Sequence, residues 1–167
     1  GAVFNQGLAL RGADSLFLDA NAQWQIAQDW HLGAAWRSGY TWARTGETIA
    51  AGSRLRSSAW AVDLGREDLF KPGDSLGLRV SQPLRVESGG LNLNLPVGYS
   101  YETLRPTFDN VLVPLVPRGR EVDAELLWQG PLYSGSAMVS LFYRRDPGHF
   151  ADLPDDKGVA ASWSWRF

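Results

Sequence analysis

The sequence has no cysteine and almost no lysine. With no cysteine among its 167 residues, a disulfide framework and a thiolate metal site are both excluded. Lys71 and Lys157 are the only lysines, and the formal net charge is −2. Nucleic acid is therefore not an expected partner, because a basic surface is what attracts it. No residues stand in a ligand spacing that predicts a metal or a cofactor.

Long apolar runs are also missing. No run of about 18 apolar residues occurs, so the sequence predicts no transmembrane helix, and no stretch has the period of an amphipathic helix. The chain opens at Gly1 without a charged-then-apolar signal segment, and we interpret it as a mature or excised piece. A membrane is not excluded, because a barrel strand needs only about 9–11 alternating residues.

Strict alternation of apolar and polar residues fills most of the chain, as in WHLGAAWRSGYTW at residues 30–42. Clusters of Gly, Pro, Asp and Ser interrupt it, which is typical of strands and turns. Strands are predicted at 15–26, 30–43, 55–65, 75–87, 91–101, 119–130, 135–145 and 158–167. Residues 1–14 would be a lead-in segment or partial strand, and residues 15–167 an all-β antiparallel barrel of eight strands. The proline-rich segment 105–119 is expected to be a loop whose apolar cluster contacts a partner or packs over the barrel mouth.

Each predicted strand has one face without charge and one polar face. Such faces fit a soluble barrel or sandwich with the apolar side inward, or a membrane barrel with that side in lipid. Strand lengths of 10–13 residues and aromatics near strand ends favour lipid. The predicted membrane-interface aromatics are Trp24, Trp30, Trp42, Trp60, Tyr99, Tyr101, Trp128, Tyr143, Trp163 and Trp165.

The polar faces carry both signs of charge in similar number. The predicted network inside the barrel comprises Asp19, Arg37, Asp63, Arg79, Arg85, Glu121, Asp123, Glu125 and Arg144. In a narrow barrel these side chains would pair and fill the interior. The alternative is a polar lining that a passenger or solute contacts, which needs a wider barrel.

Three segments in the last two-thirds of the chain are more specific than the alternation common to barrel strands. They are LFKPGDSLGLRVSQPLRVESGGLNLNLP at 69–96, GREVDAELLW at 119–128 and LFYRRDPGH at 141–149. They resemble the translocator of autotransporters whose passenger is a subtilisin-like serine peptidase. The final VAASWSWRF resembles the strand by which outer-membrane barrels are recognised for assembly, with Phe167 as the terminal signal. The resemblance implies a bacterial outer-membrane location and about twelve strands after a helix in the pore. The partners it implies are outer-membrane lipids, lipopolysaccharide, the barrel assembly machinery and a passenger polypeptide.

The predicted function is that of a translocator or anchor for a secreted passenger, and not of an enzyme. A small structural or adhesion-type barrel that works through its outer loops is the alternative. An outer-membrane hydrolase centred on His149 comes third, because no nucleophile spacing accompanies that histidine. Counting back from Phe167 puts 146–157, 102–118, 66–74 and 27–29 outside and 130–134, 88–90 and 44–54 inside. The short segment 27–29 on the outside and the longer segment 44–54 on the inside break the rule of long outer loops and short inner turns.

Overall fold

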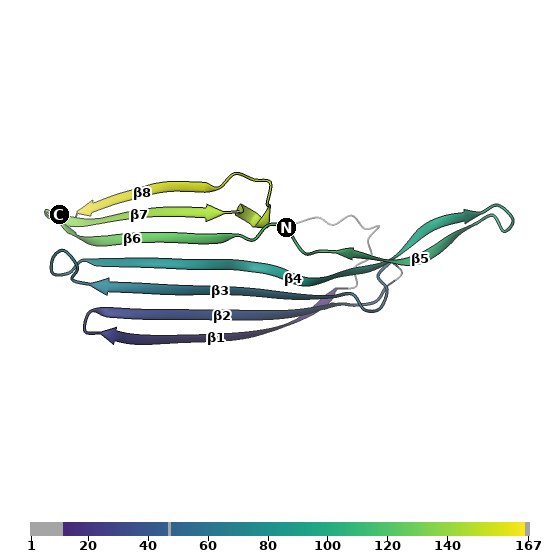
Figure 1. The fold of residues 1–167 in the computed structure, drawn as a ribbon, viewed down its shortest axis with the longest axis horizontal. Helices are drawn as coiled ribbons and strands as arrows, with labels where there is room; N and C mark the ends of the chain where they lie inside the picture. The colour runs from purple at the N-terminus through teal and green to yellow at the C-terminus, as the bar shows by residue number, and fades with distance from the viewer. Residues whose placement is uncertain (1–11, 47, 166–167) are drawn as a thin grey trace. The chain divides into compact units, whose positions relative to one another are not determined.

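The computed structural model describes residues 12–46 and 48–165. In that part of the chain every strand belongs to one antiparallel sheet (Figure 1). The strands are β1 (Ala13–Ala27), β2 (Trp30–Ala43), β3 (Arg54–Glu67), β4 (Ser75–Ser100), β5 (Arg105–Pro114), β6 (Val122–Leu132), β7 (Gly135–Arg145) and β8 (Asp156–Trp165), with a 3-10 turn at Pro147–His149. The predicted all-β antiparallel fold of eight strands is confirmed. The described residues contain no helix long and apolar enough to span a bilayer.

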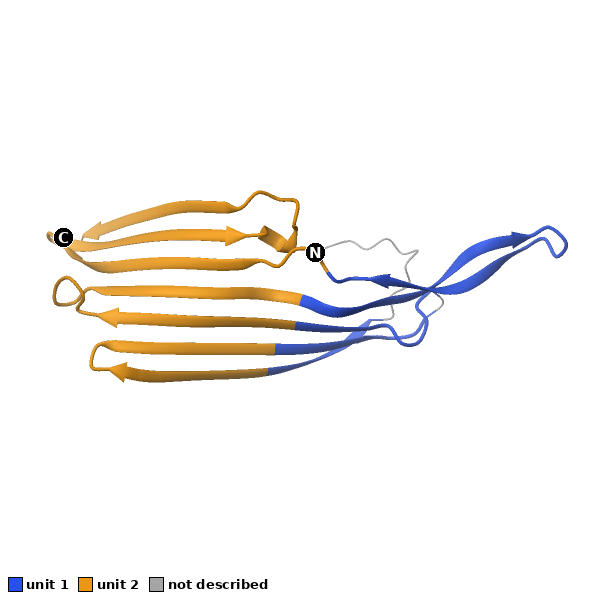
Figure 2. Ribbon diagram, viewed as in Figure 1, with its two compact units in different colours: residues 1–18, 38–57, 86–116 blue, residues 19–37, 58–85, 117–167 orange. Residues whose placement is uncertain are grey.

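The chain divides into two compact units, coloured separately in Figure 2. Unit 1 takes residues 1–18, 38–57 and 86–116, and unit 2 takes residues 19–37, 58–85 and 117–167. Strands β1 to β4 contribute to both units, β5 belongs to unit 1, and β6 to β8 belong to unit 2. Most of the lead-in segment or partial strand predicted for residues 1–14 lies outside the described residues. The signal residue Phe167 also lies outside them.

Unit 2 holds the continuous part of the sheet, in the order β1-β2-β3-β4-β6-β7-β8. Strand β4 pairs with β6 from Ser75 opposite Gln129 to Ser81 opposite Asp123. The registers of β6 with β7 and of β7 with β8 continue these cross-strand rows across two more strands. Because side chains alternate between the faces of a sheet, each row keeps apolar residues on one face and polar residues on the other.

Unit 1 is built around the hairpin of β4 and β5. Ten residue pairs join the two strands, from Gly90 opposite Pro114 to Ser100 opposite Arg105, with a register shift between Pro96 and Gly98. On the other edge of β4, Ile49 forms a bridge with Leu93. Ile49 is only 2% exposed, so the connection between β2 and β3 is held against the hairpin by pairing and burial.

Two sequence predictions in this region are wrong. Residues 88–90 do not form a turn, because β4 runs unbroken through them, and residues 105–119 are not simply a loop, because β5 occupies their first part. Gly89 has φ +102, and a Cβ there would lie 2.0 Å from the carbonyl oxygen of Arg54. A Cβ on Gly90 would lie 2.2 Å from the carbonyl oxygen of Val113. The paired glycines therefore allow close backbone approach inside a strand rather than a change of direction.

This correction also changes the topology. Consecutive antiparallel strands turn at alternate ends, so the connections 28–29, 68–74 and 133–134 share one end with the close of β8. The connections 44–53, 115–121 and 146–155 alternate with them. The prediction that 66–74 lies with the long loops, and 44–54 with the short turns, is therefore wrong. Both errors came from the turn wrongly predicted at 88–90. That extra turn reversed the predicted outside or inside assignment of every connection before it in the chain.

The sheet is open in the described residues, which show no pairing between the edge strands β1 and β8. The hydrophobic residues buried there are only Ile49, Ala61 and Ala137. A soluble sandwich needs a second layer over its apolar face. The eight described strands supply none, because all of them belong to the same sheet.

Candidate functional site

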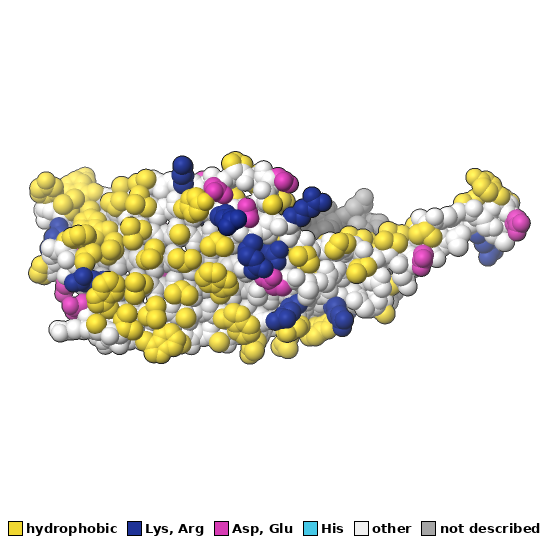
Figure 3. All heavy atoms as spheres, viewed as in Figure 1, with side chains coloured by type: hydrophobic (Ala, Val, Ile, Leu, Met, Phe, Trp, Pro, Cys, Tyr) yellow, Lys and Arg dark blue, Asp and Glu magenta, His cyan; other side chains and the backbone are white. Residues whose placement is uncertain are grey.

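The apolar face of unit 2 is a set of cross-strand rows without charge at their centre. One row joins Leu78, Leu126, Leu141 and Val159 in direct register. The next row joins Leu76, Trp128, Val139 and Ala161. The exposed fractions of Leu126, Leu141 and Val159 are 37%, 45% and 69%, so nothing in the described chain covers these rows. In Figure 3 hydrophobic side chains spread over the strands of unit 2, with scattered charges among them.

On β7 and β8, aromatic residues flank this set of rows toward both ends of the strands. Tyr143 lies on one side of the rows, and Trp163 and Trp165 lie on the other, opposite Ala137 and Gly135. The eight steps from Tyr143 to Gly135 span about 26 Å along the strand at roughly 3.3 Å per residue. The two indoles contact each other with ring centroids 4.7 Å apart, and Trp163 Nε1 donates to the carbonyl oxygen of Leu132 at 3.3 Å.

The ten predicted interface aromatics differ in exposure. The exposed members are Trp24, Trp42, Tyr99, Tyr101, Tyr143, Trp163 and Trp165, and the half-buried members are Trp30, Trp60 and Trp128. Arg66 lies over the ring of Trp30, with 5.2 Å from its Cζ to the ring centroid. Tyr99 and Tyr101 lie at the end of β4 and in the turn after it, both in unit 1. The structure therefore gathers most of the predicted set at strand ends, but it separates these two tyrosines from the rows of unit 2.

The polar face pairs much of the predicted charge network. Arg37 makes a two-pronged contact with Asp19, at 2.5 and 3.1 Å, and Arg79 donates to Asp63 at 3.1 Å. These side chains are about half exposed, so each pair contributes little free energy in water. All four side chains point away from the apolar rows, as the alternation of side chains along each strand requires.

Three of the remaining charges, Arg85, Glu121 and Glu125, bond to groups outside the network. Arg85 is 8% exposed and donates to the carbonyl oxygens of Gly119 and Pro117, at 3.0 and 2.8 Å. Glu125 accepts from Ser140 at 2.7 Å. The remaining three also have defined places: Asp123 stands opposite Arg144 in register, and Glu121 Oε2 accepts from the backbone N–H of Gly148 at 2.7 Å. One charge pair was missed from the sequence, Arg44 with Asp14 at 2.7 Å.

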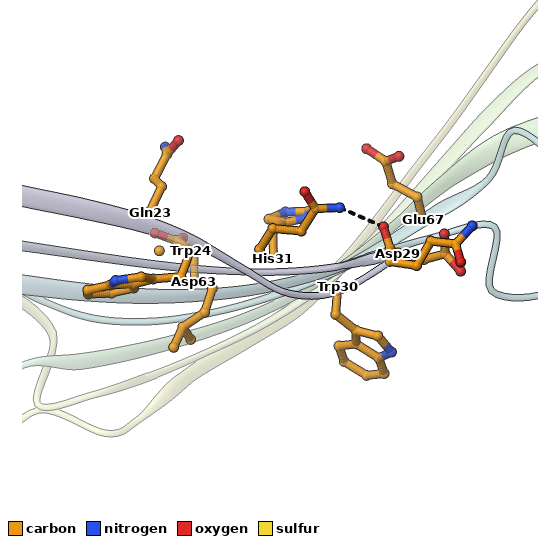
Figure 4. Close-up of a pocket in the computed structure, with 11 residues that line it drawn as sticks. Gln23, Trp24, Asp29, Trp30, His31, Asp63 and Glu67 are labelled. Atoms are coloured by element: carbon orange, nitrogen blue, oxygen red, sulfur yellow. Dashed lines mark hydrogen bonds between the residues drawn. The ribbon is translucent and has the colours of Figure 1, made fainter.

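A polar hollow of about 670 Å³ lies on unit 2 beside the turn between β1 and β2 (Figure 4). Its lining includes the carboxylates of Asp29, Asp63 and Glu67 together with His31 and glutamine side chains. Gln25 Nε2 donates to the carbonyl oxygen of Gln28 at 2.8 Å, which ties the turn together. Among the described residues no cluster of His, Asp or Glu could hold a metal ion.

Aromatic rings on the polar face lie against glycines of neighbouring strands. A Cβ added to Gly65 would lie 2.0 Å from Nε2 of His31. The ring of Phe142 meets Gly158 in the same way, with 2.6 Å to the nearest ring carbons. Each ring therefore occupies the volume that a side chain at the glycine would need, which locks adjacent strands by shape.

We expect Gly65→Val to force His31 out of its position and to lower stability by about 1–3 kcal/mol, the usual cost of overpacking. Gly77→Val is the matched control, because the nearest atom to a Cβ there is 4.0 Å away. Urea unfolding of both variants, followed by tryptophan fluorescence, measures the difference. Equal midpoints for the two variants would contradict the joint between His31 and Gly65.

His149 fastens the connection between β5 and β6 to the turn after β7. Its Nδ1 accepts from the backbone N–H of Glu121 at 2.9 Å, and its Nε2 lies 3.2 Å from the carbonyl oxygen of Leu84. Nε2 must therefore carry the ring proton and donate it to Leu84. Both ring nitrogens are committed to the backbone, so neither is available to take a proton from a serine hydroxyl. The third alternative, a hydrolase centred on His149, gains no support from this geometry.

Asp74 organises the connection between β3 and β4. It is 2% exposed, and its carboxylate accepts from the backbone N–H groups of Leu69 and Phe70 and from Trp128 Nε1, the latter at 3.2 Å. Burial raises the pKa of Asp74, but the hydrogen bonds from Trp128 and from the loop backbone outweigh it and lower the pKa below 3.8. A carboxylate that accepts several N–H donors is stabilised in its charged form.

The lowered pKa of Asp74 gives a pH dependence with a defined sign. Its contribution to stability is present above the unfolded value of 3.8 and is lost as the pH falls through the lower folded value. We expect Asp74→Ala to be less stable than the parent at pH 7. Between pH 5 and 2 its stability should fall less steeply than that of the parent. Unfolding midpoints across that range measure this, with Asp152→Ala, an exposed carboxylate, as the control. An unchanged slope in Asp74→Ala would contradict the assignment.

No family model, no curated protein and no solved structure matches this chain.

Proposed function

We propose that the chain forms the membrane-embedded wall of an outer-membrane β-barrel that serves as translocator or anchor for a secreted passenger. The observation that carries the proposal is the uncovered apolar face of unit 2. Its rows of Leu, Val and Ala end in Tyr143 and in Trp163 and Trp165, while the opposite face holds the pairs of Arg37 with Asp19 and Arg79 with Asp63. At a tilt of roughly 35–45°, a span of about 26 Å along the strand covers about 18–21 Å of height, which is most of an apolar band roughly 25 Å tall.

Aliphatic rows between aromatic ends are the pattern that a bilayer selects. Hydrocarbon favours Leu and Val at the centre, whereas tyrosine and tryptophan place their polar atoms among the headgroups. Water offers no comparable reason to leave this face uncovered, because exposed apolar patches beyond a few hundred Å² are rare on soluble proteins. The proposed partners are therefore outer-membrane lipids and lipopolysaccharide, with the assembly machinery during insertion.

The membrane part of the proposal is tested by the full chain in cells and in detergent. We expect urea-washed outer membranes to retain the protein and an unheated sample to migrate differently from a boiled one in SDS gels. A monomer that stays dispersed in buffer without detergent would overturn the proposal, because the apolar rows would then have found cover within the protein.

The translocator role needs a second experiment. A reporter domain fused ahead of residue 1 is expected to reach the cell surface, where protease added to intact cells removes it. A barrel that inserts while the reporter stays protected in the periplasm would leave the anchor in the membrane but would contradict translocation.

Adhesion through the β4–β5 hairpin is the second candidate, favoured by the side chains near its tip. Tyr101 and Leu104 are 85% and 71% exposed, and Phe108 is 54% exposed. Replacing Tyr101 and Leu104 together by Ser would abolish surface binding by an adhesin. The same change would leave reporter delivery by a translocator intact.

A further inference from the structure

Two arginines interrupt the apolar face of the sheet at the start of β3. Arg54 and Arg56 stand an even number of residues before Trp60 and Val62, so their side chains lie on the same face as these two. The contact of Arg56 agrees with this placement, because its Cζ lies 5.9 Å from the centroid of the Tyr40 ring on β2. Both arginines are exposed. This corner of the apolar face is therefore cationic.

The arginines lie beside two exposed aromatic rings. The backbone N–H of Ala43 donates to the carbonyl oxygen of Ser53 at 3.1 Å, which fixes the pairing of β2 with β3. Counting one step from that bond along the antiparallel strands places Trp42 level with Arg54, two residues from Tyr40. The exposed fractions of Tyr40 and Trp42 are 43% and 47%. Each arginine thus has an aromatic neighbour across the strands.

A hollow of about 240 Å³ lies at this corner, within the part of β2, β3 and β4 that belongs to unit 1 (blue in Figure 2). It is lined by the two rings, the two arginines, Leu55, Ser88 and Gly89. Ser88 is exposed, and its hydroxyl can donate a hydrogen bond. The lining therefore offers two guanidinium groups and a hydroxyl, and it contains no carboxylate.

The two cations differ from the arginine nearest to them in the sequence. Arg44 donates to both carboxylate oxygens of Asp14, at 3.0 and 2.7 Å. Among the described residues, neither Arg54 nor Arg56 forms an ion pair. Outside the described ranges the only acidic side chain is that of Glu47. The chain therefore offers these two cations at most one carboxylate of its own.

We infer that Arg54 and Arg56 bind a phosphate group of lipopolysaccharide at the outer surface of the membrane. This inference rests on the proposed function, in which the connection 44–53 and the adjoining ends of β2 and β3 face the cell exterior. Lipopolysaccharide forms the outer leaflet of that membrane and carries phosphates on its lipid anchor, lipid A. Its negative charge complements an exposed cationic corner of the face that contacts lipid.

The corner matches both parts of such a lipid. Guanidinium groups bind phosphate through two parallel N–H donors, and Arg54 and Arg56 are about 7 Å apart along the strand, so both can contact one phosphorylated headgroup. The rings of Tyr40 and Trp42 offer apolar surface to acyl chains and keep their polar atoms at headgroup level. An arginine on the lipid face is costly at the bilayer midplane and costs little near the interface, which agrees with a place among headgroups.

Native mass spectrometry of the full chain in detergent micelles tests the inference, because it counts bound lipids by their mass. The parent chain is expected to hold one lipid A that carries two phosphates. It is expected to give at least ten-fold less complex with the same lipid A after both phosphates have been removed. This comparison needs no substitution, so a folding defect cannot produce it. Equal amounts of complex with the two lipids would overturn the inference.

A pair of double variants tests the residues. Arg54→Gln with Arg56→Gln is expected to give at least ten-fold less complex with phosphorylated lipid A than the parent. The control is Arg105→Gln with Arg118→Gln, which removes the same charge from two exposed arginines that also lack an ion pair in the described part of the chain. The control is expected to bind like the parent. Equal binding by the two double variants would overturn the inference.

Two further measurements address other partners for the arginines. Inorganic phosphate in about ten-fold excess is expected to leave lipid A bound, because the free ion has no acyl chains to contact Tyr40 and Trp42. Displacement of the lipid would assign the hollow to a free anion. Glu47→Gln is expected to bind lipid A within two-fold of the parent, and a larger gain would show that Glu47 neutralises the arginines. Either of these contrary results would overturn the inference.

Failure of the inference is distinguishable from failure of the proposed function. A chain that stays dispersed in buffer without detergent would contradict the membrane location itself. A chain that is retained in urea-washed outer membranes but binds both forms of lipid A equally would contradict the phosphate site alone.

Discussion

Leu126→Arg is expected to prevent stable insertion of the protein, whereas Leu127→Arg one residue further along β6 is expected to be tolerated. Leu126 lies in the row with Leu78, Leu141 and Val159 on the apolar face. Leu127 lies on the polar face, opposite Ser140. An arginine near the bilayer midplane costs a barrel about 2–4 kcal/mol. On the polar face its guanidinium meets charged and hydroxyl groups instead.

The measurement is the fraction of each variant that survives urea washing of outer membranes, together with the heat-dependent gel shift. The parent and Leu127→Arg are expected to match, and Leu126→Arg to lose most of the assembled form. The comparison also separates the membrane from a soluble reading. Leu126 is 37% exposed, so in water its replacement would cost only the lost part of its burial, about 1–2 kcal/mol, and would not affect insertion. Equal behaviour of the two variants would therefore remove the basis for placing this face in lipid.

The strands of unit 2 were predictable because alternation is a local property. Strand β7 was predicted at exactly the residues where it occurs, and β2 likewise. In both, the apolar face is set by alternate residues, and the ends are marked by turn formers such as Asp29 and Ser134. The sequence also put Asp19, Arg37, Asp63 and Arg79 on the polar face, because alternate residues of a strand share one side, but it did not predict which of them pair.

The errors arose where one residue type supports two geometries. Gly89 and Gly90 were interpreted as a turn, because glycine allows the positive φ that turns need. The same freedom allows two backbones to approach closely, and the contacts with Arg54 and Val113 come from distant parts of the chain. Proline at 106 and 114 suggested a loop, yet both residues stand at the ends of β5, where a lost N–H is tolerated.

The locking contacts of the site could not be predicted from the sequence. His31 and Gly65 are 34 positions apart, and nothing local indicates that an imidazole would cover that glycine. His149 drew attention as a candidate base, whereas its ring joins Glu121 and Leu84 through their backbone groups. Such partners follow from register and loop conformation, which depend on the whole sheet.

Gly90→Val is expected to separate β5 from β4 at the base of the hairpin. The added side chain would begin 2.2 Å from the carbonyl oxygen of Val113, and that oxygen belongs to backbone, which cannot move aside as a flexible side chain would. Gly90 also stands opposite Pro114 at the last pair of the hairpin. We expect a cost at or above about 3 kcal/mol, the upper part of the range for overpacked sites.

Gly98→Val in the same strand is the matched control, because the nearest atom to a Cβ there is the hydroxyl oxygen of Thr107 at 3.7 Å. Limited proteolysis is expected to cut Gly90→Val within residues 101–116 at least ten-fold faster than either the parent or Gly98→Val. The urea resistance of β6 to β8 should stay unchanged, because those strands belong to unit 2 and only β6 among them pairs with β4, at residues 75–81. If both variants were cut at the parental rate, the glycine at 90 would not be a point of close backbone contact. If the rows of unit 2 also became labile, the hairpin and the wall would unfold together, and their division into two units would have no counterpart in stability.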